Sequence, residues 1–155
     1  MIRRKEIRIS EIEDNLAKII DAVEIVENNL SSDFDSFSGS GLLKEGIYKK
    51  IEFAIESILD ICNIINSDLR LGVPEAEENI IEHLERNKIL DKKAILLIKE
   101  MKKFRNVLVH KYGDVDDAKA YENIKNGLID FEIIIKEIEI FLDKYKLKDK
   151  RVLKK

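Results

Sequence analysis

The sequence has few of the residues that build cross-linked or sharply turning folds. A single cysteine, Cys62, excludes an intramolecular disulfide and a cysteine-based zinc site. One proline and six glycines leave few breaks, so the structural elements should be long. Tryptophan is absent. No apolar run approaches the roughly 20 residues that a membrane span requires, and the opening MIRRKEIRIS is too charged for a signal peptide. We therefore expect a cytoplasmic protein that does not associate with membranes.

The residues that are abundant favour helices. Hydrophobic residues make up 45% of the chain and charged residues 38%, a balance typical of helices with one apolar stripe and one charged face. Ile and Leu recur at steps of three and four, and no alternation typical of strands stands out. The pattern predicts an all-α, up-and-down bundle of about five helices. We expect a single domain over residues 1–155, with a core at about 10–146 and a basic tail at 147–155.

The periodicity also predicts the helix boundaries. The expected helices cover about residues 10–30, 42–66, 74–87, 91 into the segment 104–114, and 117–146. Residues 31–41, SSDFDSFSGSG, are predicted to form a flexible connecting loop because Ser, Asp and Gly favour turns. We read the basic tail as a frayed end that remains able to contact RNA phosphates.

Local signals indicate where the helices begin. Ser10 and Glu13 have the spacing of a capping box. Pro74 suits the first position of the third helix, and the acidic residues within 75–78 suit its N-terminal turn. Asp91 is a good N-cap for the fourth helix.

Three other polar features have a structural interpretation. The carboxylates within residues 114–117 resemble a metal-binding cluster, but capping of the last helix explains them more simply, so we expect no metal site and no cofactor. Cys62 falls on an apolar stripe and should be a core residue. His83 has no ligand-type residue at a suitable spacing and should be a packing or surface residue.

One segment contains several residues whose side chains can bind phosphate or take part in catalysis. Arg105, Asn106, His110, Lys111 and Tyr112 lie within eight positions, directly after an apolar stripe. Arginine matches two phosphate oxygens with its planar fork. Histidine exchanges protons near neutral pH. Asparagine can orient an imidazole, and tyrosine offers a hydroxyl or a stacking surface. The segment therefore indicates chemistry at a phosphodiester.

The basic residues around this segment favour a local nucleic-acid contact. The net charge of −3 excludes a protein that binds nucleic acid through its overall charge. Lys102, Lys103 and Lys111 supply positive potential beside the segment, so we expect them to contact RNA.

Helix geometry constrains how the segment works. Asn106 and His110 are four residues apart and share a helix face, whereas Arg105 and His110 diverge by about 140° on a regular helix. They meet in one cleft if the helix unwinds after Leu108, where β-branched residues and Gly113 weaken it, or if two copies of the segment face each other in a symmetric dimer. We favour the dimer. A structural interpretation also stays open at this point, with His110 at a helix end and Tyr112 packed on the bundle.

The segment RNVLVHKY resembles the R-x-x-x-x-H-x-Y signature of HepT-like proteins in the HEPN superfamily. Arg105, Asn106, His110 and Tyr112 stand at the arginine, the following polar position, the histidine and the tyrosine. The order of helices is also similar over roughly residues 9–146. The basic tail is less typical of the family.

The resemblance implies a function and a partner. Members of this family are metal-independent endoribonuclease toxins that act as dimers with a composite active site. Their usual partner is a nucleotidyltransferase antitoxin of the MNT type, which transfers AMP to the motif tyrosine, here Tyr112. By this resemblance, Arg105 holds the scissile phosphate, His110 is general acid or base in attack by the ribose 2′-hydroxyl, and Asn106 orients His110 or the phosphate.

Two other interpretations follow from the same residues. In the first, the protein is a non-catalytic partner of a nucleotidyltransferase, with Tyr112 as acceptor or contact. In the second, it is a structural helical dimer whose site has decayed. The complete arginine–histidine pair argues against both, because a passive subunit has no use for it.

Overall fold

The computed structural model describes residues 6–110 and 114–153, apart from the side chains of His110 and of residues 149–153. Six helices form within these ranges: α1 (Ile9–Asn29), α2 (Phe34–Ser38), α3 (Leu42–Asp68), α4 (Glu77–Arg86), α5 (Lys92–His110) and α6 (Asp117–Leu153). The described residues contain no strand. The predicted all-α class is confirmed.

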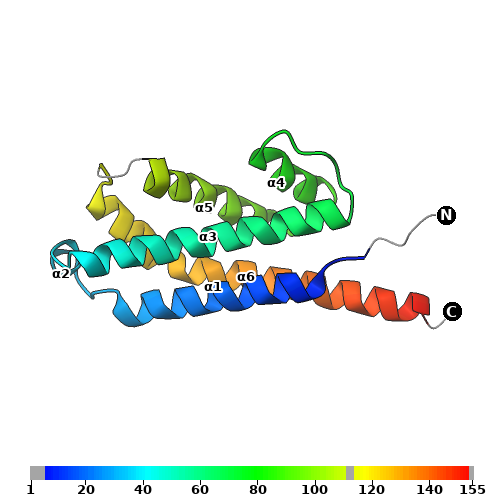
Figure 1. Ribbon diagram of the computed structural model, residues 1–155, viewed down its shortest axis with the longest axis horizontal. Coiled ribbons are helices and arrows are strands. Elements are labelled where there is room, and N and C mark those ends of the chain that lie inside the picture. Colours follow the sequence, from blue (N-terminus) through cyan, green and yellow to red (C-terminus); the bar gives the residue numbers. More distant parts are fainter. Residues whose placement is uncertain (1–5, 111–113, 154–155) are drawn as a thin grey trace.

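Four of the helices form the bundle. The helix α3 packs between α1 and α5, and α6 closes the ring by contacting both α1 and α5 (Figure 1). The chain runs along α1, back along α3, forward again along α5 and back along α6, which makes the up-and-down arrangement predicted from the periodicity. The two short helices are additions at opposite ends, with α2 against α6 and α4 against α3 and α5.

Isoleucine dominates the core because it recurs on the inward face of each long helix. On α3, the fully buried side chains include Ile51, Ile55, Ile58, Ile61 and Ile65, which suits a helix with neighbours on several sides. Cys62 is also fully buried, and burial raises the pKa of its thiol to about 12. It is an unreactive core residue, as expected.

The start of α1 differs from the prediction. The helix begins at Ile9, with Arg8 as its N-cap and no side-chain cap, so Ser10 lies inside the first turn and the predicted capping box with Glu13 is wrong. A tertiary contact replaces the cap. The backbone N–H of Arg8 donates to Asp68 Oδ2 at 2.8 Å, and the Arg8 guanidinium forms an ion pair with the same carboxylate at 3.1 Å. The end of α3 thereby holds the start of α1.

The predicted loop between α1 and α3 contains the short helix α2. Asp33 caps it by accepting from the backbone N–H of Ser36 at 2.8 Å. Phe37 is fully buried, with ring centroids 5.7 Å from Tyr48 and 5.1 Å from Tyr121. Reading residues 31–41 as a flexible connector was therefore wrong, because one aromatic residue fixes the segment to the bundle.

Of the two helix starts predicted on either side of α4, the one at Pro74 is wrong and the one at Asp91 is confirmed. Pro74 precedes the helix instead of opening it; α4 begins at Glu77, and the Asn79 side chain accepts from the backbone N–H groups of residues 75 and 76. Asp91 caps α5 as predicted, accepting from the backbone N–H of Ala94 at 2.8 Å.

The helix α5 ends within the predicted segment, and α6 extends beyond its prediction. No break follows Leu108, since α5 continues through His110, and residues 111–113, where Gly113 was expected to stop the helix, lie outside the described residues. Tertiary packing of Leu108, which is buried, outweighs the slight helix-weakening effect of its valine neighbours. The helix α6 reaches Leu153, so the tail at 147–153 is helical and not frayed, because it is rich in Lys, Leu and Arg and contains no Gly or Pro.

Within the described part of the chain, no helix combines the length and the apolarity needed to cross a membrane.

The central position of α3 gives a stability prediction. Replacing Ile58, which is 0% exposed on α3, with alanine should lower the free energy of unfolding by about 2–5 kcal/mol, because it removes buried methyl groups and leaves a cavity. The matched control is Ile129→Ala on α6, where the side chain is 57% exposed and the loss should stay below about 1 kcal/mol. Urea unfolding followed by circular dichroism measures both. Equal losses in the two variants would contradict the described packing.

Candidate functional site

The helix α5 presents the motif because its other residues are fixed in the core. Ala94, Ile95 and Ile98 are buried in its first half and Leu108 near its end, so the rotation of α5 about its axis is set. Arg105 and Asn106 are half-buried and follow one another on the side of α5 that meets α4.

Arg105 is paired with a carboxylate from α4. Its Nη2 donates to Glu77 Oε1 at 2.8 Å. The Arg105 side chain is only 14% exposed, whereas the Glu77 side chain is 45% exposed, so the carboxylate lies over the guanidinium on its solvent side. The Nε of Arg105 is buried and has no hydrogen-bond partner. The guanidinium therefore donates to Glu77 through Nη2, while its Nε–H group donates to no acceptor among the described residues.

A second ion pair lies one turn earlier on α5. The Lys102 ammonium donates to Glu78 Oε1. Lys102 is buried, with a side chain 9% exposed, while Glu78 is 66% exposed. The hydrogen bond and charge of Lys102 hold the pKa of the Glu78 carboxyl below its usual range. Lys102, predicted to contact RNA, thus faces Glu78 from within the protein.

These residues enclose a small hollow between α4 and α5, which we call the α4–α5 hollow. Its volume is about 410 Å³, and Glu56, Ala76, Glu77, Glu78, Lys102, Arg105, Asn106 and Val109 line it. Two cations therefore face three carboxylates. The described part of the chain contains no group of three or more His, Cys, Asp or Glu residues that could hold a metal ion.

The structure describes only part of the remaining predicted site residues. His110 is the last residue of α5, and its backbone alone is described. Lys111 and Tyr112 lie outside the described residues, so the predicted modification site does too. Lys103 is exposed on α5 and forms an ion pair with Glu100 at 3.3 Å. Arg105, Asn106 and Lys102 are thus brought together, and Lys103 lies on another side of the helix.

Sequence reasoning missed the glutamates that contact the motif. Glu77 and Glu78 read as charges suited to a helix N-terminus, and they do occupy the first turn of α4. Their pairing with Arg105 and Lys102 depends on the path of the segment 69–76, which places α4 against α5. No short-range sequence pattern predicts that path. The three-residue spacing of Lys102 and Arg105 was the available signal, since it places two cations on one face.

A second polar cluster joins α3 to the start of α6, near the end of α5. Lys44 Nζ and the Tyr48 hydroxyl donate to the two Asp117 carboxylate oxygens at 2.8 and 2.6 Å. Burial opposes ionisation of Asp117, but these two hydrogen bonds outweigh it and lower the pKa of Asp117. Burial, and then the bond to Asp117, raises the pKa of Tyr48. A hollow of about 710 Å³ lies beside this cluster and is also lined by Leu108 and Val109 of α5.

The carboxylates that precede α6 have the role expected of them. Asp116 Oδ1 accepts from the backbone N–H groups of Ala118 and Lys119 at 3.1 and 3.2 Å. It therefore caps α6, which confirms the capping interpretation for Asp116, whereas Asp117 accepts from Lys44 and Tyr48 instead. His83 is also structural, with its Nδ1 2.8 Å from the Asn66 Oδ1.

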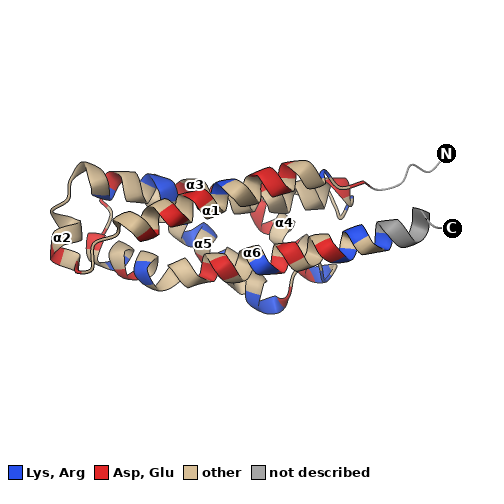
Figure 2. Ribbon diagram, turned by 90° about the horizontal axis from the view of Figure 1, so that it is seen from below, with Lys and Arg blue, Asp and Glu red and all other residues tan. Residues whose placement is uncertain are grey.

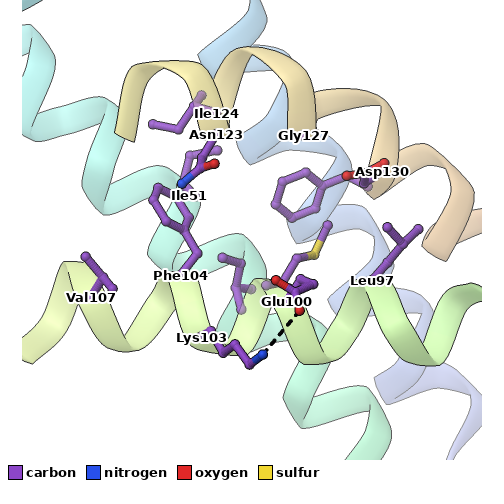
Figure 3. A pocket seen from close by; sticks show the side chains of 13 residues that line it. Ile51, Leu97, Glu100, Lys103, Phe104, Val107, Asn123, Ile124, Gly127 and Asp130 are labelled. Atoms are coloured by element: carbon purple, nitrogen blue, oxygen red, sulfur yellow. Dashed lines mark hydrogen bonds and ion pairs between the residues drawn. The ribbon is translucent and has the colours of Figure 1, made fainter. Parts of the chain in front are cut away.

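The opposite side of α5 is apolar. Phe104 and Val107 of α5 line a groove of about 290 Å³ together with Ile51 of α3 and Ile124 of α6 (Figure 3). The Glu100–Lys103 ion pair spans the rim of this groove on α5. In the view of Figure 2, Lys and Arg are interspersed with Asp and Glu along the helices, and the charged residues of α1 are mainly acidic. The motif helix thus separates a charged hollow from an apolar groove.

The chain is similar to proteins of one family. A family model described as ribonuclease HepT-like matches residues 12–138. The mRNA nuclease HepT of Shewanella oneidensis strain MR-1 is 25% identical over 107 residues, which cover 69% of this chain and 80% of that protein.

Solved structures share the fold. The tri-AMPylated HEPN toxin of Shewanella oneidensis, in complex with its MNT antitoxin, has a TM-score of 0.75 at 23% identity, covering 84% of this chain and 97% of that one. YutE from Bacillus subtilis, a cytosolic protein of unknown function, has a TM-score of 0.75 at 21% identity, covering 90% and 93%. Because the family model spans most of the chain and includes the whole motif, the protein belongs to the ribonuclease HepT-like family.

Proposed function

We propose that the protein is a metal-independent endoribonuclease, the toxin of a toxin–antitoxin pair. The observation that carries this proposal is the placement of Arg105 and Asn106, half-buried at a hollow on a helix that continues without a break to His110. The family and the relative named as an mRNA nuclease support it.

The proposed reaction needs only groups that this motif supplies. The ribose 2′-hydroxyl attacks the adjacent phosphorus as His110 accepts its proton, and the bond to the 5′-oxygen breaks as this oxygen takes up a proton from solvent water. The products are a 2′,3′-cyclic phosphate and a 5′-hydroxyl. Arg105 stabilises the charge that develops on the phosphate oxygens, and Asn106 orients the phosphate or His110. No electron transfer occurs, and no step requires a metal or a cofactor.

The register of α5 favours a site made by two copies. Because α5 is helical from residue 92 to residue 110, Arg105 and His110 are separated by about 140° around its axis. A single copy therefore presents them on different faces. In a symmetric dimer, the arginine of one copy and the histidine of the other can approach the same phosphate near the two-fold axis. We propose this homodimer as the active form.

We further propose that an MNT-type nucleotidyltransferase is the antitoxin and that Tyr112 is the AMP acceptor. The phenolic oxygen would displace pyrophosphate from the α-phosphorus of ATP. The bulky anion, two residues from His110, would then repel RNA phosphate. The AMPylated toxin of Shewanella oneidensis in complex with its antitoxin supports this proposal. We place the reaction in the cytoplasm, where RNA and ATP are present; the similarly folded YutE is described as cytosolic.

Cleavage in the presence of EDTA tests the proposed function. Purified wild-type protein should cut RNA and leave 2′,3′-cyclic phosphate ends, whereas His110→Ala should lose at least about 100-fold in rate because its general acid–base group is gone. Circular dichroism checks that the variant keeps its helicity. Intact mass must first show Tyr112 to be unmodified, because an adduct would suppress activity. An unmodified wild type that leaves RNA intact would support the non-catalytic partner subunit instead.

The two neighbouring lysines should respond differently to substitution. Lys103 is exposed, so Lys103→Ala should weaken RNA binding and leave the free energy of unfolding nearly unchanged. Lys102 is buried against α4, so Lys102→Ala should lower the free energy of unfolding by about 2 kcal/mol through lost packing of its stem. Filter binding and urea unfolding measure the two effects. A larger stability loss for Lys103→Ala would contradict the placement of these side chains.

A further inference from the structure

The proposed phosphate ligand, Arg105, is already bound by a carboxylate of the same chain. Carboxylate and phosphate oxygens are alternative partners for a guanidinium fork, since both accept paired N–H bonds in the same geometry. Glu77 Oε1 accepts from Arg105 Nη2 at 2.8 Å. The Nε on the same guanidinium is buried without a partner. The arginine is therefore occupied, but incompletely satisfied.

We propose that Glu77 is an intramolecular competitor of RNA at Arg105, which substrate phosphate must displace before cleavage. This inference rests on the proposed ribonuclease function and concerns the regulation of that same site. It assigns to Glu77 a role in controlling substrate entry, separate from the chemistry of the motif.

The charges around the arginine support competition. The α4–α5 hollow holds Lys102 and Arg105 against Glu56, Glu77 and Glu78. Lys102 is engaged by Glu78, so it does not offset the remaining carboxylates for an incoming polyanion. With Glu77 in place, an RNA phosphate would approach a region of excess negative charge. Movement of Glu77 alone removes one of these charges and frees the arginine Nη2.

The exposures of the two side chains make the exchange feasible without unfolding. Arg105 is 14% exposed and held by its helix, whereas Glu77 is 45% exposed and is the first residue of α4. A change of rotamer moves the Glu77 carboxylate into solvent. The helix α4 remains anchored through Ile81 and Leu84, which are buried in the core. In the bound state the guanidinium has exchanged one anionic partner for another.

The opposite possibility is that Glu77 holds Arg105 in its working position. The two roles predict different effects of replacing Glu77 on the kinetic constants. A competitor lowers the affinity for RNA, so its removal should lower KM and leave kcat unchanged. A positioning residue supports the transition state, so its removal should lower kcat.

Glu77→Gln is the test variant, because the amide keeps the size of the side chain and replaces a charge-assisted hydrogen bond with a neutral one. The matched control is Glu82→Gln. Glu82 is exposed on the same helix and is not one of the described residues that line the hollow. Both variants change the net charge equally. Working at about 0.15 M salt limits long-range effects, because the Debye length is then about 8 Å.

Binding is measured by fluorescence anisotropy with a mixed-sequence RNA whose riboses are fully 2′-O-methylated, so that it cannot be cut. Glu77→Gln should bind it about two- to five-fold more tightly than wild type, the factor expected for a partly exposed ion pair. Glu82→Gln should bind it as wild type does. With unmodified RNA, KM should fall for Glu77→Gln by a similar factor while kcat stays constant. If Glu77→Gln is unstable, Glu77→Asp provides a second variant, which shortens the reach to Arg105 and should also bind more tightly.

Three results would overturn the proposal. If Glu77→Gln and Glu82→Gln change affinity equally, the effect is one of net charge. If Glu77→Gln binds RNA more weakly or loses kcat, Glu77 positions Arg105. If neither the wild type nor any variant binds or cuts RNA, the proposed function itself fails. The first two results leave the ribonuclease activity standing, so the two failures are distinguishable.

Discussion

The packing of α5 against α3 is the constraint on which the rest of the account depends. Buried residues such as Ile95 and Ile98 fix the rotation of α5 about its axis, and Leu108 extends that control nearly to its end. Arg105 and Asn106 must then face α4, while Phe104 faces the apolar groove on the opposite side. The face of α5 on which Arg105 and Asn106 lie follows from this register, and so does the separation of about 140° between positions 105 and 110.

The same packing explains why the site is charged and yet not a simple basic patch. The arginine lies in a partly dry environment, where a guanidinium needs a counter-ion. Glu77 supplies one from α4, as Glu78 does for Lys102. In an acidic protein, such pairs let strong cations lie at a surface without attracting every polyanion. The contact between Arg105 of α5 and Glu77 of α4 thus underlies both the proposed catalysis and the proposed competition with RNA.

The sequence was sufficient for features that depend on periodicity or on a local motif. The isoleucine stripes predicted the bundle, and Asp91 and the acidic segment before α6 predicted two helix starts. Features set by contacts distant in sequence were missed. Asp68 replaces the cap expected at Ser10, and Phe37 turns a predicted loop into an anchored helix. The pairing of Glu77 with Arg105 belongs to this second group, because it depends on the path of the chain between α3 and α4.

Positions 105 and 110 lie about 140° apart on one copy of α5, so the proposed site takes Arg105 from one copy and His110 from the other. Mixing the inactive variants Arg105→Gln and His110→Ala tests it directly, after the dimers are allowed to exchange subunits. Mixed dimers hold one intact arginine and one intact histidine on opposite copies, so RNA cleavage should return in the mixture although neither variant cuts alone. A mixture that stays inactive beside a wild type that cuts RNA in the same buffer would contradict the account.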